Sequence, residues 1–208
     1  MQPAKFLAML LASALPLAAA AQTADVTAVS GDVTPLNDLG QEISGTVSLA
    51  PQGDDLFITL NVEGAAPGMH LAHVHGFATR EPDDATCPDM SADANGDGVV
   101  DLIETREAAG VTMIPFTDTP ASLEINADTY PEAGQDGRLS YAQTVPIAQL
   151  RNAVEATFGT QLALDRRVVF IHGAPDGAEL PDSVQSLEGV PARVTVPVAC
   201  AELVAAES

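Results

Sequence analysis

The chain has 208 residues and is strongly acidic, with 8 Lys and Arg against 29 Asp and Glu and a formal net charge of -21 at pH 7. Its length suits one domain, and its 46% of hydrophobic residues can form a core, which argues against a disordered chain. The charge argues against nucleic acid and anionic membrane surfaces as partners, because binding phosphate groups requires clustered Lys and Arg.

The first 21 residues have the pattern of a signal peptide. Lys5 precedes an apolar run over residues 6–21, which ends in the small residues Ala19–Ala21, so cleavage is predicted before Gln22. A transmembrane anchor is the alternative, but the run is short of the roughly 20 residues that a span needs. We therefore expect a periplasmic or secreted protein whose mature domain, residues 22–208, does not insert into a membrane.

The chain contains two cysteines, Cys87 and Cys200. An even number of cysteines in an exported protein favours one disulfide over two free thiols, because the compartment is oxidising. Metal ligation is the alternative, although the chain has no CxxC or CxxH pair.

Most of the chain after residue 25 has the pattern of short strands. Apolar and polar residues alternate over 43–50, strand formers follow at 56–62, and the turn residues Pro51–Asp54 lie between them, which predicts a hairpin. Residues 77–110, rich in Asp, Pro, Gly and Ala, are predicted to be a long loop insertion. Further strands are predicted at 68–76, 111–116, 122–127, 137–145, 167–172 and 190–204, and one short helix at 146–158. This order predicts an all-β antiparallel sandwich or barrel.

Three of the four histidines lie within six residues, at His70, His73 and His75. Side chains at i and i+2 of a strand point to one face, so His73 and His75 are expected to converge, whereas His70 has the opposite parity. Imidazole is a suitable ligand for copper, zinc, iron and nickel. The alternative is that these histidines are exposed or hydrogen-bonded and hold no metal.

Three segments resemble Cu/Zn superoxide dismutases. Gly68–Phe77 resembles the strand in which two alternate histidines bind copper, and Val168–Asp176 resembles the late strand that carries another copper histidine. Val198–Ala201 resembles the final strand, whose cysteine is bridged to a loop cysteine, here Cys87. The resemblance implies a Greek-key β-sandwich or barrel of the superoxide dismutase type. It also implies the copper candidates His73, His75 and His172, with His70 as a further candidate that matches a structural histidine of the family.

The sequence departs from that family at several functional positions. No histidine occurs in Pro88–Asp93, where the family has the residue that bridges copper and zinc, and the other zinc histidines are also absent. Zinc is therefore not expected. Pro197 occupies the position of the arginine that guides anions, and Arg193 has a different offset. Met69, Met90 or Met113 could supply a soft donor for the missing copper ligand, or water could complete the site.

The insertion contains a sequence that matches the EF-hand calcium loop, Asp93–Glu104. Oxygen ligands are expected at the six loop positions, which here are Asp93, Asn95, Asp97, Val99 through its carbonyl, Asp101 and Glu104. Gly98 falls where the loop turns sharply, and Val100 falls where such loops pack inward. Calcium is therefore a predicted structural cofactor, and the alternative is a solvated acidic loop.

These patterns favour an exported metal-binding protein with a candidate copper site and a structural calcium loop. The first alternative is a copper-only superoxide dismutase, which converts superoxide to O2 and H2O2. The second is a calcium-stabilised structural module that holds no copper and has no catalytic activity. No catalytic residue is assigned, because the chain lacks GxSxG, P-loop and HExxH motifs and its carboxylates are too numerous to single out a pair. Protein partners are not identified by these patterns.

Overall fold

The computed structural model describes residues 26–206, so the predicted signal peptide lies outside the described residues. The strands are β1 (Val29–Pro35), β2 (Ser44–Gln52), β3 (Asp55–Glu63), β4 (Gly68–Met69), β5 (Ala72–Gly76), β6 (Val111–Pro115), β7 (Glu132–Ala133), β8 (Leu139–Pro146), β9 (Val168–His172), β10 (Pro197–Glu202) and β11 (Val204–Ala205). The helices are α1 (Arg106–Ala109), α2 (Ile147–Phe158) and α3 (Ala192–Thr195), with 3-10 turns η1 (Met90–Ala92), η2 (Pro120–Ser122), η3 (Ala127–Thr129) and η4 (Leu164–Arg166).

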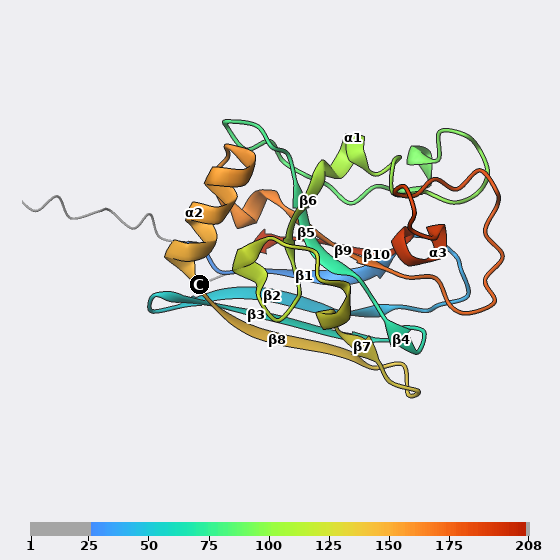
Figure 1. Cartoon of the computed structure of the whole chain (residues 1–208), viewed down its shortest axis with the longest axis horizontal. Helices are drawn as coiled ribbons and strands as arrows, with labels where there is room; N and C mark the ends of the chain where they lie inside the picture. Colours follow the sequence, from blue (N-terminus) through green and yellow to red (C-terminus); the bar gives the residue numbers. More distant parts are fainter. Residues whose placement is uncertain (1–25, 207–208) are drawn as a thin grey trace, which may run out of the picture.

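The fold is mostly β, as predicted. One antiparallel sheet has the strand order β6-β5-β9-β10-β1-β2-β3-β8, with β11 added beside β1, and β4 pairs separately with β7. The sheet curls into a half-barrel, so that β1, β2, β3 and β8 form one side and β5, β6, β9 and β10 the other (Figure 1). The main hydrophobic core lies between these strands and includes residues from both sides.

The predicted hairpin is formed by β2 and β3, which pair in register from Ser44–Glu63 to Gln52–Asp55. Its turn is tighter than predicted, because Gly53 adopts a φ of 63° and allows Gln52 to remain paired. Alternate residues of β3, beginning with Leu56 and Ile58, are buried in the core. The alternation therefore sets which face of the hairpin packs inward.

The predicted helix is present as α2, whose buried residues are Leu150 and Val154. It ends at Gly159, which adopts the left-handed conformation common at helix C-termini. Two further helices of four residues each, α1 and α3, are also present. Within residues 26–206, no helix combines the length and apolar character needed to cross a bilayer.

The predicted strand at 122–127 is wrong. That segment lies between η2 and η3, and Leu123 has a φ of 59°, which interrupts any extended run. The predicted strand at 190–204 is correct only from Pro197 onward. Pro191 has a φ of -58°, which suits the start of a helical turn, and α3 follows it.

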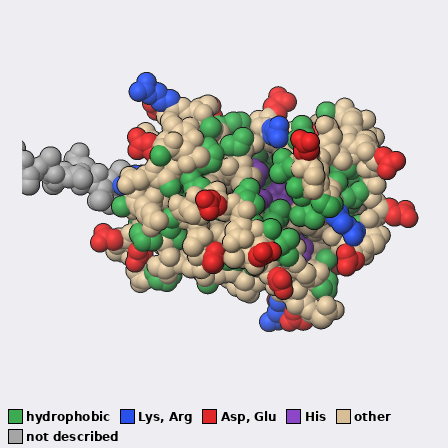
Figure 2. Space-filling model, in the orientation of Figure 1, with side chains coloured by type: hydrophobic (Ala, Val, Ile, Leu, Met, Phe, Trp, Pro, Cys, Tyr) green, Lys and Arg blue, Asp and Glu red, His purple; other side chains and the backbone are tan. Residues whose placement is uncertain are grey.

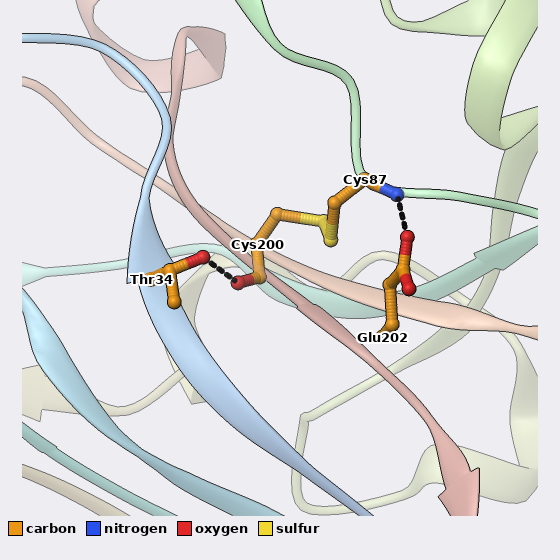
Figure 3. Close-up of a disulfide and its surroundings, with 4 residues drawn as sticks. All are labelled: Thr34, Cys87, Cys200 and Glu202. Atoms are coloured by element: carbon orange, nitrogen blue, oxygen red, sulfur yellow. Dashed lines mark hydrogen bonds between the residues drawn. A yellow bond between two sulfur atoms is a disulfide. The ribbon is translucent and has the colours of Figure 1, made fainter.

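The disulfide between Cys87 and Cys200 is present and confirms the prediction from cysteine count (Figure 3). It joins the long insertion to β10. The backbone N–H of Cys87 also donates to the carboxylate of Glu202 at 3.0 Å, and the Thr34 hydroxyl donates to the Cys200 carbonyl at 3.3 Å (Figure 3). The start of the insertion is therefore attached covalently and through hydrogen bonds to the strands.

Arg167 is a buried cation at the start of β9. Its guanidinium donates to the carbonyls of Leu162, Phe77 and Gln161, and burial lowers its pKa. Gly76 makes room for it, since a Cβ there would lie 2.4 Å from Nη1 of Arg167. The Arg167 side chain thus connects the residue after β5 to the segment before β9.

Candidate metal centre

The three candidate copper ligands come from two neighbouring antiparallel strands. His73 and His75 lie on β5, where they are paired with Phe170 and Val168 of β9, respectively. His172 is the last residue of β9, and its backbone N–H donates to the carbonyl of Leu71. The pairing of β5 with β6 shifts register between Val74 and His75. The side chains of His73 and His75 converge as predicted, and β9 adds the third histidine.

These histidines form a compact buried cluster. One ring nitrogen from each can be chosen so that the three atoms lie within 4.8 Å of one another, and each residue is at most 4% exposed. The ring centroids of His73 and His172 are 4.9 Å apart, and those of His73 and His75 are 5.5 Å apart. Within the described part of the chain, this is the one group of three or more His, Cys, Asp or Glu side chains close enough to hold an ion.

Hydrogen bonds outside the cluster orient the rings. Nδ1 of His172 donates to the carbonyl of Thr195 at 2.7 Å, so the lone pair of the neutral ring is on Nε2. Nε2 of His75 lies 3.1 Å from the hydroxyl of Thr112. Nε2 of His172 and Nδ1 of both His73 and His75 are buried without a hydrogen-bond partner. Buried polar atoms are rarely left unpaired, and the arrangement at His75 and His172 is typical of histidines that bind a metal through one nitrogen and are held through the other.

The environment keeps the three imidazoles neutral. Burial is the largest cause that lowers the pKa of His73 and His75, and the neighbouring His172 lowers both further. Burial also lowers the pKa of His172 to about 4, although its hydrogen bond to Thr195 acts in the opposite direction. Neutral imidazole is the form that binds metal, so protons compete little for this site at neutral pH.

His70 does not belong to this cluster. Its Nδ1 lies 3.0 Å from the carbonyl of His172, and its Nε2 lies 2.7 Å from the carbonyl of Ala66. Both ring nitrogens are therefore directed at backbone oxygens, and neither faces the other imidazoles. His70 thus connects the short segment between β4 and β5 to the end of β9.

Two aromatic residues that the sequence did not indicate pack on the cluster. Tyr130 makes an edge contact with His73 at a centroid distance of 5.5 Å, and Phe170 makes one with His75 at 4.8 Å. The Tyr130 hydroxyl is buried without a hydrogen-bond partner, and burial raises the pKa of Tyr130, so the hydroxyl stays protonated. No sequence pattern identified these contacts, because Tyr130 comes from an irregular segment and Phe170 reads as an ordinary core residue.

The three histidines line a surface pocket, and none of the three methionines proposed as a fourth ligand is part of its lining. Met113 is buried in the main core. Met69 and Met90 are exposed, on β4 and η1 respectively. The three histidines therefore leave a side open toward the pocket, where water or another molecule can approach.

The acidic loop folds back on its own backbone amides. Oδ1 of Asp93 accepts from the N–H of Gly96 at 2.8 Å, and Oε1 of Glu104 accepts from the N–H of Ala94 at 2.9 Å. The first and twelfth positions of the predicted calcium loop therefore both turn toward the loop interior. The carboxylates do not form a group close enough to hold an ion by side-chain distance alone.

The same loop is attached to the rest of the protein at several points. Oδ2 of Asp101 accepts from the N–H of Gln185 at 2.7 Å, and the hydroxyl of Ser183 donates to Asp97 at 2.6 Å, which lowers the pKa of Asp97. Val100 is fully buried, and its N–H and carbonyl both bond to the side chain of the buried Asn37. The loop is thus held against residues 183–185 and against Asn37, two residues after β1.

No model of a known protein family matches this chain, and a comparison with curated proteins gives no match either. What the site can do therefore follows from its own chemistry: three buried neutral imidazoles, an open side, and a loop of carboxylates attached nearby.

Proposed function

We propose that this protein is an exported metal-binding protein with a fold of the Cu/Zn superoxide dismutase type, and that it binds one copper ion through His73, His75 and His172. The observation that carries the proposal is a buried cluster of three histidines in which one ring nitrogen from each comes within 4.8 Å of the others. Each of these histidines also has one buried ring nitrogen without a hydrogen-bond partner. Leaving buried polar atoms unpaired destabilises the metal-free protein, and a cation at the cluster would accept the imidazole lone pairs that face it.

The arrangement of the strands and the position of the disulfide also support the proposed fold type. The antiparallel sheet is curled, β5 and β9 lie side by side, and the disulfide joins the insertion to β10. These are relationships that the resemblance to superoxide dismutases implies. A Greek-key sandwich of that type is therefore the fold that we infer.

Copper is the metal that we propose because of the donor set. Among the first-row divalent metals, copper generally binds a given nitrogen site most tightly. No carboxylate of the described residues lines the pocket. Three nitrogens with an open side also suit a metal that changes its coordination between two oxidation states. The ion would supply a Lewis acid and redox centre at the base of the pocket.

Elemental analysis tests this proposal directly. Mature protein is loaded with copper, desalted and measured by elemental mass spectrometry, and we expect close to one copper per chain. His172→Gln and His75→Gln are expected to lose it. His70→Gln is the matched control, because His70 is equally buried but has both nitrogens directed at carbonyls. Equal copper in wild type and His172→Gln would refute the site.

We also propose that the acidic loop binds one calcium ion and thereby orders the insertion. The support is the full match to the ligand spacing and the inward direction of Asp93 and Glu104. Calcium binding to the folded state alone raises the melting temperature by mass action. We expect a chelator to lower the melting temperature of wild type and of Asp83→Ala, an exposed acid in the same insertion, but not that of Asp93→Ala. An equal response of all three proteins would contradict the proposal.

A further inference from the structure

The histidine cluster forms the base of a pocket of about 230 Å³. Its walls come from segments that are far apart in the sequence, including the turn after the acidic loop, the start of β6, the irregular residues 123–127 and the segment before α3. Figure 2 shows histidine side chains at the centre of this face of the molecule, surrounded by hydrophobic ones. The open side of the proposed metal site therefore faces a defined cavity.

The walls of the pocket are aliphatic. Eight of the lining residues are Leu, Ile, Val or Ala, and among the described lining residues none is Asp or Glu, although the chain has 29 of them. The one charged lining residue is Arg106, which is exposed. Because no carboxylate of residues 26–206 lines this cavity, its walls differ in character from the acidic surface of the rest of the protein.

Exposed apolar side chains gather at this pocket. Within residues 26–206, seven large hydrophobic residues are exposed, and three of them line the pocket: Val111 at 42%, Ile125 at 56% and Leu187 at 46%. Leaving such side chains in water gives no folding benefit, and an apolar cavity with a few convergent polar groups is typical of a small-molecule site. The polar residues of the lining are the three histidines, Thr112, Thr195 and Arg106.

We infer that this pocket binds an uncharged aliphatic small molecule whose polar end lies over His73, His75 and His172 and whose chain contacts Ile125 and Leu187. The inference deepens the proposed function and rests on it, because it assigns a ligand class to the open side of the proposed copper site. A volume of about 230 Å³ corresponds to roughly eight water molecules at ~30 Å³ each, so the ligand has about that many non-hydrogen atoms.

The chemistry of the walls disfavours a charged ligand. A carboxylate or other anion would lose its hydration among aliphatic side chains, and the net charge of -21 repels it at long range. Arg106 is exposed at the pocket, where water screens its charge. An uncharged head group, such as a hydroxyl, can approach the imidazoles without these costs.

Binding of straight-chain alcohols tests the inference. Metal-free protein is titrated with 1-butanol, 1-pentanol and 1-hexanol while methyl signals are followed by nuclear magnetic resonance. We expect the affinity to rise about fourfold for each added methylene, and hexanoate to bind at least tenfold more weakly than 1-hexanol. No dependence on chain length, or hexanoate binding as tightly as 1-hexanol, would overturn the inference.

Three matched variants locate the binding. Ile125→Asp and Leu187→Asp place a carboxylate at the pocket, and each is expected to weaken 1-hexanol binding at least tenfold. Val204→Asp is the control, because Val204 is exposed to a similar degree on β11 and does not line the pocket. All three positions are exposed, so the variants are expected to fold. Equal binding by the three variants would place the alcohol elsewhere and overturn the inference.

The alcohol titration and the copper measurement together separate this inference from the proposed function. Alcohol binding to the metal-free protein together with no copper uptake would support the pocket and refute the copper site. Copper uptake close to one per chain without alcohol binding would support the copper site and refute the ligand class.

Discussion

Lowering the pH of the metal-free protein is expected to destabilise it through the buried histidines. His172 has its pKa lowered to about 4 by burial, whereas an unfolded chain has a histidine pKa of about 6.5. In the unfolded state His172 therefore binds a proton as the pH falls below about 6.5, and in the folded state it does so only near pH 4. Stability is fully retained above the unfolded pKa and is lost as the pH falls between these two values.

The size of the effect follows from the two pKa values. At about pH 5, His172 is almost fully protonated in the unfolded chain and largely neutral in the folded protein, which costs about 2 kcal/mol of unfolding free energy relative to about pH 8. Burial and the charge of His172 also lower the pKa of His73 and His75, so these histidines act in the same direction.

Urea unfolding of chelator-treated protein at the two pH values measures this loss. His172→Gln lacks the titrating group and also relieves its two neighbours, so wild type should lose at least about 2 kcal/mol more than the variant on acidification. The carboxylates that titrate in the same range are common to both proteins and cancel in the comparison. Parallel loss of stability in wild type and His172→Gln would refute the neutral, buried state of this imidazole.

Three further substitutions test how the site is supported, each by urea unfolding. Arg167→Met removes a buried donor of three hydrogen bonds and should cost about 3 kcal/mol, whereas Arg138→Met, at an exposed ion pair, should cost less than about 1 kcal/mol. Replacing Cys87 and Cys200 together by serine opens a loop with a sequence separation of 113 and should cost about 4–5 kcal/mol in the chain-entropy model. Asn37→Ala leaves the backbone groups of the acidic loop and of β10 unpaired and should cost about 2–4 kcal/mol. Losses below about 1 kcal/mol for Arg167→Met, the cysteine pair or Asn37→Ala would contradict these assignments.

The regular parts of the fold could be predicted because their patterns are local. The alternation in β2 and β3 and the helical spacing of Leu150 and Val154 each follow from burial of one face. The partners of the strands could not be predicted in this way. That β9 lies between β5 and β10 is decided by packing between segments about a hundred residues apart, and no local pattern carries that information.

The candidate site, like the fold, could be predicted only where its pattern is local. The two-residue spacing of His73 and His75 predicts their convergence, whereas His172 was identified only by resemblance to a family. The groups that orient the rings were not predicted at all, because the carbonyl of Thr195 has no sequence signature and Thr112 is an ordinary strand residue. The pocket that contains Arg106 was likewise not foreseen.

The predicted strand at 68–76 is split into β4 and β5, and the two segments in which predicted strand residues form no strand are both walls of the pocket. Residues 122–127 and 190–196 have enough aliphatic residues to resemble strands, and they supply Ile125, Val190 and Val194 to the lining. Their apolar residues therefore do not follow the period of a sheet, because they face a cavity and not a neighbouring strand. Local rules are usually violated where function requires it, since a sequence shaped only by folding would bury or replace such residues. The two segments thus supply part of the apolar lining above the histidines, and the alcohol titration tests whether that lining serves a ligand.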